Sequence, residues 1–458
     1  MLYASDLISQ YLPWYYITAQ YLKNFQLPHW VSFAQDGVYP LLAEGETGVL
    51  SPINSLILYL FPFSVSVNLL YLIYFALAIL GMYLFLRVNQ LSKLSSIFGA
   101  LVFALSGYMI SRYFQPSIIF TAALVPLGFA FIQKSQTVNN KVPFLLAPLI
   151  YLQITAGHLQ IALISIAGYL TFFLLLTFLN KKPLVPSLVK ILVIVGLGIC
   201  LSAPQLLPSF KLFALSERSH WDPMIRFAYS LPPSHLITYI RPYAFGISTP
   251  GDDLGFTQIG GGFWELNLTI WTLPFFLSLI PLFIIAKNRR QSKVDKTIIS
   301  LYIIWLFFLL LSFGGYFKLY RVIAHINYFP FRAPSRFLLI STFAASTLAA
   351  FGFEIITKRL KKSVRVAAFF IILISILLQQ KLLLTKYIIT KPSSQVVANV
   401  RQSSKYQLTT PLKLDSEKID NLEEPPKVFV KEFQIGLLFS LIGILLLYFW
   451  YRKSRKHP

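Results

Sequence analysis

The chain has 458 residues, of which 56% are hydrophobic and only 12% are charged, about half the charged fraction of ordinary soluble domains. This composition excludes a soluble globular enzyme and a disordered chain, and it is typical of a membrane protein. Forty basic residues against 17 acidic ones give a net charge of +23. The single cysteine, Cys200, excludes an internal disulfide and a metal site built from several cysteines.

Eleven apolar runs approach the length of about 20 residues that a transmembrane helix needs. They predict an all-α, polytopic integral membrane protein with about eleven transmembrane helices. A shorter apolar segment at 50–63 favours a re-entrant or interfacial helix. The predicted spans are 66–86, 95–111, 117–133, 142–157, 159–179, 191–210, 263–286, 297–313, 337–357, 366–384 and 434–451.

The basic residues predict the orientation of the chain. Of the 40, 21 lie in the short turns on one side of the predicted spans and in the C-terminal tail, together with two acidic residues, Asp295 and Glu354. Because Lys and Arg in short loops mark the cytoplasmic side, the C-terminus is predicted to be cytoplasmic and the N-terminus of this chain extracytoplasmic. Basic residues spread over several turns do not form one face, which argues against nucleic acid as a partner.

This orientation divides the chain into four parts. Residues 1–65 are predicted to form a first extracytoplasmic loop that includes the interfacial helix, and 66–384 a transmembrane bundle with an outer loop at 211–262. Residues 385–433 are predicted to form a polar extracytoplasmic loop, and 434–458 the last transmembrane helix with a basic cytoplasmic tail. Since loops on a rigid scaffold often carry function, the outer segments are where we expect the site.

Two aspartates in the first outer segment are candidate catalytic residues: Asp6 in SDLISQYLPWYY and Asp36 in DGVYPLLAEGETGVLSPIN. A carboxylate at the membrane surface can act as a general base toward a sugar hydroxyl. The alternatives are structural. Asp6 would cap a helix that begins near Leu7, and Asp36 would serve the turn that Gly37 indicates.

Two glutamates, Glu44 and Glu46, lie two residues apart in a glycine-flanked loop. They are candidates for binding the hydroxyl groups of an acceptor substrate or a divalent cation. The histidines show neither HxxxH nor HExxH spacing, so the identity of any metal stays unknown and no other cofactor is indicated.

Outer cations are candidates for binding a phosphate, because the planar guanidinium group matches phosphate oxygens. Snorkelling toward lipid headgroups is the alternative. Arg332 and Arg336 are four residues apart and would share a helix face if a helix began at Pro334 or earlier. His158, in AGHLQIA, is a further binding candidate or a hydrogen-bonded spacer. The arginines of this set are Arg112, Arg218, Arg241, Arg332 and Arg336.

The order of SDLISQYLPWYY, PHW, DGVYPLLAEGETGVLSPIN, AGHLQIA and FRAPSRFLL resembles the bacterial YfhO-type membrane proteins of the GT-C glycosyltransferase superfamily. The resemblance covers roughly residues 1–360. It implies a GT-C-like bundle in the bacterial plasma membrane and a sugar donor linked to polyprenyl phosphate. It also implies an extracytoplasmic acceptor, which would be a cell-envelope glycan, a lipid or a protein, with Asp6 as general base.

In the GT-C superfamily the catalytic acidic residue follows a first transmembrane helix, and no such helix precedes Asp6 here. We therefore expect one more helix upstream of the present sequence.

Two other classes of function stay open. A transporter or lipid flippase needs ionisable residues within its spans, and Glu354 is the only acidic residue clearly within a predicted helix pattern. A noncatalytic protein of envelope assembly is the second alternative.

Overall fold

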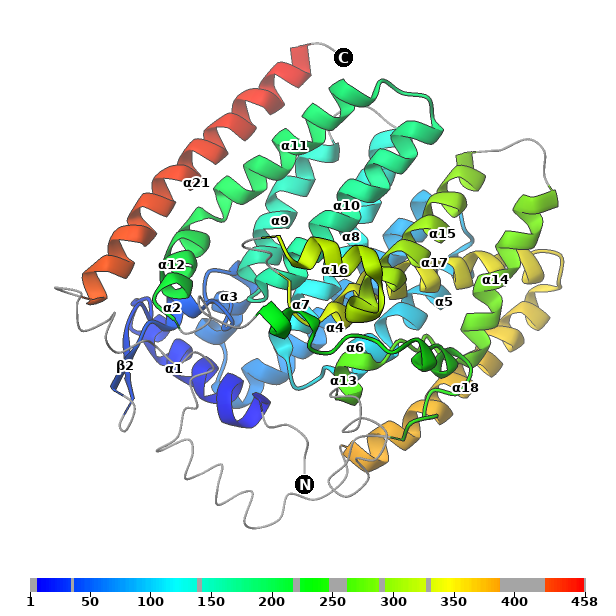
Figure 1. Cartoon of the computed structure of the whole chain (residues 1–458), viewed down its shortest axis with the longest axis horizontal. Helices are drawn as coiled ribbons and strands as arrows, with labels where there is room; N and C mark the ends of the chain where they lie inside the picture. Colours follow the sequence, from blue (N-terminus) through cyan, green and yellow to red (C-terminus); the bar gives the residue numbers. More distant parts are fainter. Residues whose placement is uncertain are drawn as a thin grey trace.

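The structure, a computed structural model, describes residues 6–33, 37–137, 142–216, 223–246, 262–287, 293–326, 331–387 and 425–456. These residues form a bundle of helices with one small β-hairpin (Figure 1).

Nine helices among the described residues are long and apolar enough to cross a membrane. They agree with nine of the eleven predicted spans and support a polytopic membrane protein. The span 159–179 coincides with α10 (Leu159–Leu179), because its apolar run ends at the polar residues His158 and Asn180. The nine segments are Phe63–Val88, Lys93–Ser111, Pro116–Gln136, Leu159–Leu179, Leu184–Leu201, Val294–Ser312, Pro334–Thr357, Lys362–Lys381 and Phe429–Phe449.

The other two predicted spans correspond to shorter helices. Within 142–157, a short 3₁₀ helix, η2 (Val142–Leu145), precedes α9 (Leu146–Thr155). Within 263–286, the short helix α13 (Phe263–Leu266) is separate from α14 (Thr272–Lys287). In the described part of the chain, neither of these two predicted spans is therefore one helix long enough to cross a membrane.

The predicted span 191–210 is displaced. Helix α11 (Leu184–Leu201) begins earlier and includes Lys190, and a second helix, α12 (Ala203–Ala214), follows directly. The two helices meet at Ser202. The break follows from Pro204, which lacks the backbone N–H that a continuous helix would need.

The N-terminal segment is compactly folded. A turn of π-helix, η1 (Leu7–Tyr11), continues into α1 (Leu12–Lys23). Strand β1 (Val31–Phe33) pairs antiparallel with β2 (Gly37–Tyr39), and the ring of Tyr39 stacks on Trp14 with ring centroids 6.3 Å apart. Helices α2 (Leu41–Glu44) and α3 (Pro52–Leu60) follow, and α3 confirms a short helix within 50–63.

The core of the bundle contains an aromatic cluster to which α10 contributes. Phe129 lies 4.2 Å from Phe343 and 5.2 Å from Phe172 between ring centroids, which joins three helices in one cluster. The remaining elements are α4 (Phe63–Val88), α5 (Lys93–Ala104), α6 (Gly107–Ser111), α7 (Pro116–Ala123), α8 (Val125–Thr137), η4 (Pro223–Phe227), η5 (Pro233–Tyr239), α15 (Lys293–Ser312), η8 (Gly314–Tyr316), α16 (Lys318–Ala324), η9 (Pro334–Phe337), α17 (Leu338–Thr357), α18 (Lys362–Tyr387) and α21 (Pro425–Lys456).

The two ends of the bundle differ in chemistry. At one end Lys182 Nζ donates to Gln136 Oε1 at 2.7 Å, and Lys296 Nζ donates to Asn180 Oδ1 at 3.2 Å. These bonds gather the ends of α8, α10 and α15, and we call this the basic end. Helix α10 begins at the opposite end, after His158, where the candidate site lies.

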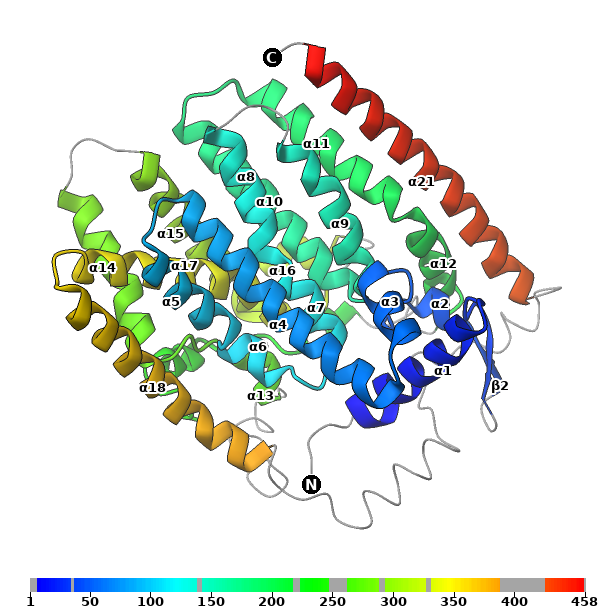
Figure 2. The same cartoon turned by 180° about the vertical axis from the view of Figure 1, so that it is seen from behind.

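Helix α21 lies along one edge of the bundle and α18 along the opposite edge, as both views show (Figures 1 and 2). Helix α21 packs on α11 and α12. Its first turns also contact the N-terminal segment. Phe429 lies 5.4 Å from Trp30 and Phe433 lies 4.9 Å from His29, measured between ring centroids.

Candidate functional site

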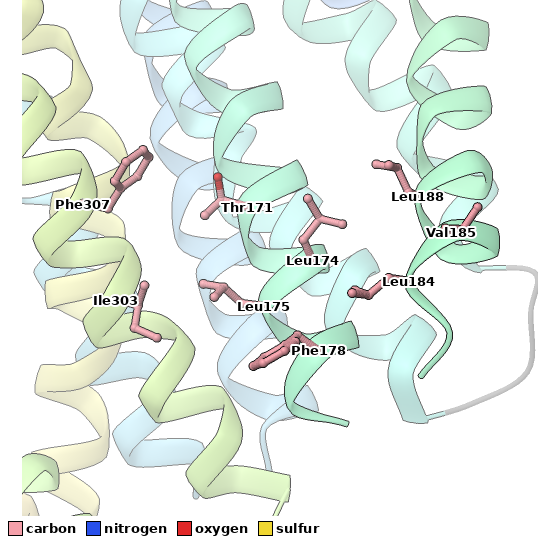
Figure 3. Close-up of a pocket in the computed structure, with 9 residues that line it drawn as sticks. All are labelled: Thr171, Leu174, Leu175, Phe178, Leu184, Val185, Leu188, Ile303 and Phe307. Carbon is pink, nitrogen blue, oxygen red and sulfur yellow. The ribbon is translucent and has the colours of Figure 1, made fainter. Parts of the chain in front are cut away.

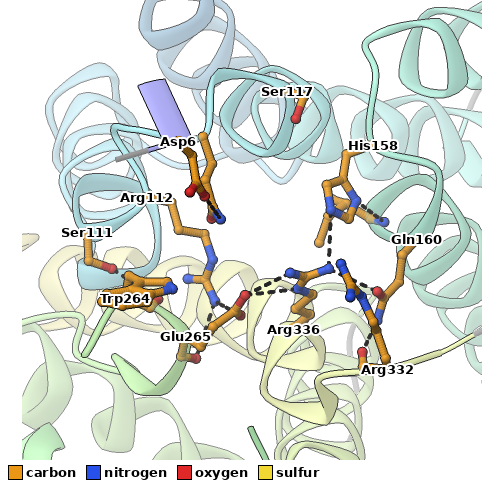
Figure 4. Close-up of polar contacts among 12 residues, drawn as sticks. Asp6, Ser111, Arg112, Ser117, His158, Gln160, Trp264, Glu265, Arg332 and Arg336 are labelled. Atoms are coloured by element: carbon orange, nitrogen blue, oxygen red, sulfur yellow. Dashed lines mark hydrogen bonds and ion pairs between the residues drawn. The ribbon is translucent and has the colours of Figure 1, made fainter. Parts of the chain in front are cut away.

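Three charged side chains from distant parts of the sequence meet at the end of the bundle where α10 begins. Glu265, on α13, lies between the guanidinium groups of Arg112 and Arg336 (Figure 4). Arg112 Nη2 donates to Glu265 Oε2 at 2.9 Å, and Arg336 donates to Glu265 Oε1 through Nη2 at 2.8 Å and Nε at 3.1 Å. We call these three residues the charged triad.

Burial makes the triad strongly coupled. The side chains of Arg112 and Glu265 are 0% and 2% exposed, so their charges interact in a medium of low dielectric constant. Burial alone would raise the pKa of Glu265, but Arg336 and Arg112 lower it to about 2. Glu265 is therefore ionised at neutral pH and compensates one of the two arginine charges.

The guanidinium group of Arg112 is buried within the protein. Its carbon lies 3.8 Å from the centroid of the Tyr108 ring, and its Nη1 donates to the backbone oxygen of Tyr108 at 3.3 Å. The alternative that Arg112 snorkels to the surface is therefore wrong. Its bonds to the side chain and backbone oxygen of Glu265 instead hold the end of α6 against α13.

His158 and Gln160 extend the triad. Arg336 Nη1 donates to Gln160 Oε1 at 3.0 Å and lies 3.2 Å from His158 Nε2. His158 also caps α10, because its Nδ1 accepts the backbone N–H of Ile161 at 3.3 Å. Burial, Arg336 and Arg332 lower the pKa of His158 well below its usual value, so the imidazole is neutral.

The protonation state of His158 has a consequence for the contact with Arg336. Since Nδ1 accepts a hydrogen bond, the neutral ring carries its hydrogen on Nε2. In this tautomer Nε2 is a donor beside Arg336 Nη1, which donates to Gln160 Oε1; in the other tautomer Nε2 accepts a hydrogen bond from Nη1.

Other donors near the triad also lack acceptors. Within the described part of the chain, no hydrogen-bond partner is found for Arg112 Nε, the Tyr108 hydroxyl or Asn267 Nδ2, and all three atoms are buried. Buried donors of this kind are costly. The half-buried side chains at this end, His158 and Arg332, are the ones that an anionic group with several oxygens, such as a phosphate, would reach.

Arg332 and Arg336 lie close to His158, but they do not share a helix face. Helix η9 begins at Pro334, as the sequence analysis required, yet Arg332 precedes it, and Ala333 adopts a left-handed conformation with φ of 50°. Arg332 is half-buried, and its backbone oxygen accepts a hydrogen bond from Gln160. Of the two arginines, Arg332 is the more exposed.

Asp6 lies beside this cluster. Its Oδ2 accepts a hydrogen bond from Gln115 Nε2 at 3.2 Å, and the backbone N–H of Gln115 donates to the oxygen of Arg112 at 2.8 Å. Asp6 makes no side-chain cap to the helix that begins at Leu7, so the capping alternative is wrong. The carboxylate is half-buried and faces the connection between α6 and α7.

Glu44 and Glu46 face different partners. Glu44 accepts from the Tyr39 hydroxyl at 2.6 Å. Glu46 Oε2 accepts from Gln10 Nε2 and from the Tyr11 hydroxyl, each at 2.9 Å. In the ranges that the structure describes, no group of three or more His, Cys, Asp or Glu side chains could hold a metal ion.

Two of the predicted residues, Asp36 and Arg218, lie outside the described residues. Arg241 is exposed, directly after η5. Glu265 was missed, although it falls inside the predicted span 263–286, and so Glu354 is not the only acidic residue in a predicted helix pattern. An isolated acidic residue in an apolar run was the signal that could have identified it.

The chain matches no known protein-family model, and no curated protein sequence matches it.

Proposed function

We propose that this chain is a membrane glycosyltransferase of the GT-C type that transfers a sugar from a polyprenyl-phosphate donor to an acceptor on the extracytoplasmic side. The single observation that carries the proposal is the convergence of Asp6, Arg112, His158 and Arg336 at one end of the bundle. These residues come from four separate segments, and the sequence predicts each of them as a catalytic or binding residue.

The proposed roles follow from position. Asp6 is half-buried, so its carboxylate can receive the proton of an acceptor hydroxyl as the new glycosidic bond forms. The negative charge that develops on the departing lipid phosphate is stabilised by Arg332 and Arg336, which act from a site with little water. Glu265 and Arg112 position Arg336 rather than contacting substrate.

The position of His158 supports the same roles. A phosphate presents several acceptor oxygens, and His158 Nε2 lies 3.2 Å from Arg336 Nη1. Because His158 is neutral at physiological pH, it would contribute a hydrogen bond without adding a charge. The orientation proposed from the basic turns, with this end extracytoplasmic and in the bacterial plasma membrane, completes the proposal.

The test uses the full chain reconstituted in bilayers with a panel of radiolabelled polyprenyl-phosphate hexoses and a membrane glycan acceptor. Asp6→Asn is expected to reduce transfer by at least about 100-fold, the usual contribution of a general base, while Asp6→Glu retains part of the rate. Asp295→Asn, at the basic end, is the matched control and leaves the rate unchanged. Unchanged transfer in Asp6→Asn would contradict the role of Asp6.

The same preparation distinguishes the alternatives. Movement of the labelled lipid between leaflets without a new glycosidic bond would assign the chain to the lipid flippases. Addition of EDTA tests the divalent cation that the sequence suggested at Glu44 and Glu46.

A further inference from the structure

An open apolar groove lies along α10 near the basic end, far from the charged triad. Its volume is about 590 Å³, and its floor is one face of α10, formed by Thr171, Leu174, Leu175 and Phe178. Figure 3 shows α15 on one side of this face, with Ile303 and Phe307, and α11 on the other. The spacing of the four residues on α10 gives a slot about 10 Å long, parallel to the helix axis.

The lining is wholly apolar in character. Thr171 is the one lining residue with a hydroxyl group. This hydroxyl donates a hydrogen bond to the backbone oxygen of Ala167 at 2.8 Å, so it needs no partner in the groove. Phe178 is 66% exposed and Val185 is 72% exposed, which shows that the slot opens on the outer surface of the bundle. An apolar chain fits such a slot.

Lysines follow the end of α10 beyond Phe178 and lie on the two helices that flank the groove. Lys181 and Lys182 follow α10 directly and are exposed, and Lys190 lies on α11. Lys296, in the first turns of α15, reaches Asn180 at the C-terminal end of α10. The groove is formed by α10, α11 and α15. In these three helices and in the turn between α10 and α11, the only acidic residue is Asp295.

An apolar slot that ends at a group of cations matches one kind of amphiphile. We propose that the groove binds an anionic glycerophospholipid, with one acyl chain along α10 and the phosphate headgroup at Lys181 and Lys182. Basic pockets between membrane helices bind such headgroups. A helix of a second copy would fill the slot but would not match the positive charge beyond its end. The proposal is independent of glycosyl transfer, because the groove and the triad lie toward opposite ends of α10.

The test compares spin-labelled phosphatidylglycerol with spin-labelled phosphatidylcholine bound to the full chain in phosphatidylcholine bilayers. We expect a preference for phosphatidylglycerol that falls about fivefold for each lysine replaced by glutamine at positions 181 and 182, since each cation near a headgroup contributes about 1 kcal/mol. The control is the pair Lys361→Gln and Lys362→Gln, at the start of α18, which retains the preference.

A second variant tests the acyl chain. Leu174→Trp fills the slot and is expected to remove one immobilised lipid, whereas Leu192→Trp, on an exposed part of α11, does not. The proposal is overturned if the lysine variants behave as their control does. It is also overturned if Leu174→Trp changes the oligomeric state without changing lipid binding, because the groove would then be an interface between copies.

Discussion

Replacing Glu265 by glutamine would remove the one negative charge of the buried triad while keeping the shape of the side chain. The amide can still accept one hydrogen bond, but its NH₂ group would face a guanidinium donor. Arg112 and Arg336 would then repel each other with no carboxylate between them. Breaking a buried ion pair by removing one partner costs about 3–5 kcal/mol.

The lowered pKa of Glu265 has the same cause, since the two arginines favour its ionised form. A shift from 4.5 to about 2 is of the same order, about 3 kcal/mol at neutral pH. We therefore expect Glu265→Gln to lower the free energy of unfolding by about 3 kcal/mol. Because the folded pKa lies below the unfolded one, this contribution is complete above pH 4.5 and is lost as the pH falls toward 2.

The assay is SDS titration of the detergent-solubilised chain, followed by circular dichroism. Glu354→Gln is the matched control. Glu354 is a half-buried carboxylate that accepts hydrogen bonds from Ser92 and Ser95 rather than from arginines, and its amide variant should lose about 1 kcal/mol or less. A loss below about 1 kcal/mol in Glu265→Gln, or a larger loss in Glu354→Gln, would refute the reasoning.

Three further predictions concern the same end of the bundle. Since the fold lowers the pKa of His158, protonation opposes folding as the pH falls below about 6.5. His158→Asn keeps a helix cap and should remove the part of the acid sensitivity that appears between pH 6.5 and 5, measured by thermal unfolding at several pH values. Gly107→Ala should destabilise the chain, because its Cβ would lie 2.1 Å from Asn267 Oδ1, and a melting temperature equal to the parent's would contradict this packing. Ala333→Gly should relieve about 1 kcal/mol of backbone strain at a φ of 50° without loss of stability, whereas Ala333→Val should destabilise in the same melting assay.

The helices were predictable from the sequence where a single apolar run lies between polar residues, as α10 shows. The errors have physical reasons. The predicted span 191–210 begins too late because the charge of Lys190 interrupts the apolar run. The long aliphatic stem of a lysine can nevertheless lie within a membrane helix while its charge reaches out. The predicted span 263–286 is continuous because apolar content alone does not reveal the break between α13 and α14.

The candidate site was predictable only in part. Asp6, His158, Arg332 and Arg336 were selected by residue type and by their place between apolar runs, and the structure brings them to one end of the bundle. Glu265 was missed because the pairing of a buried acid with two arginines depends on contacts between residues more than 70 positions apart. Such partners follow from the tertiary packing of α6, α13 and η9, which no local pattern encodes.

The contacts between α21 and the N-terminal segment also affect the order in which the protein can be assembled during synthesis. Trp30 and Phe429 are roughly 400 residues apart in the sequence, and contacts of such long range form late in folding. The segment that begins with Asp6 leaves the ribosome before every other described element, yet its packing is completed by a helix made roughly 400 residues later. A ribosome-arrested chain without α21 should therefore expose Trp30 to protease, while the core around α10 is already protected.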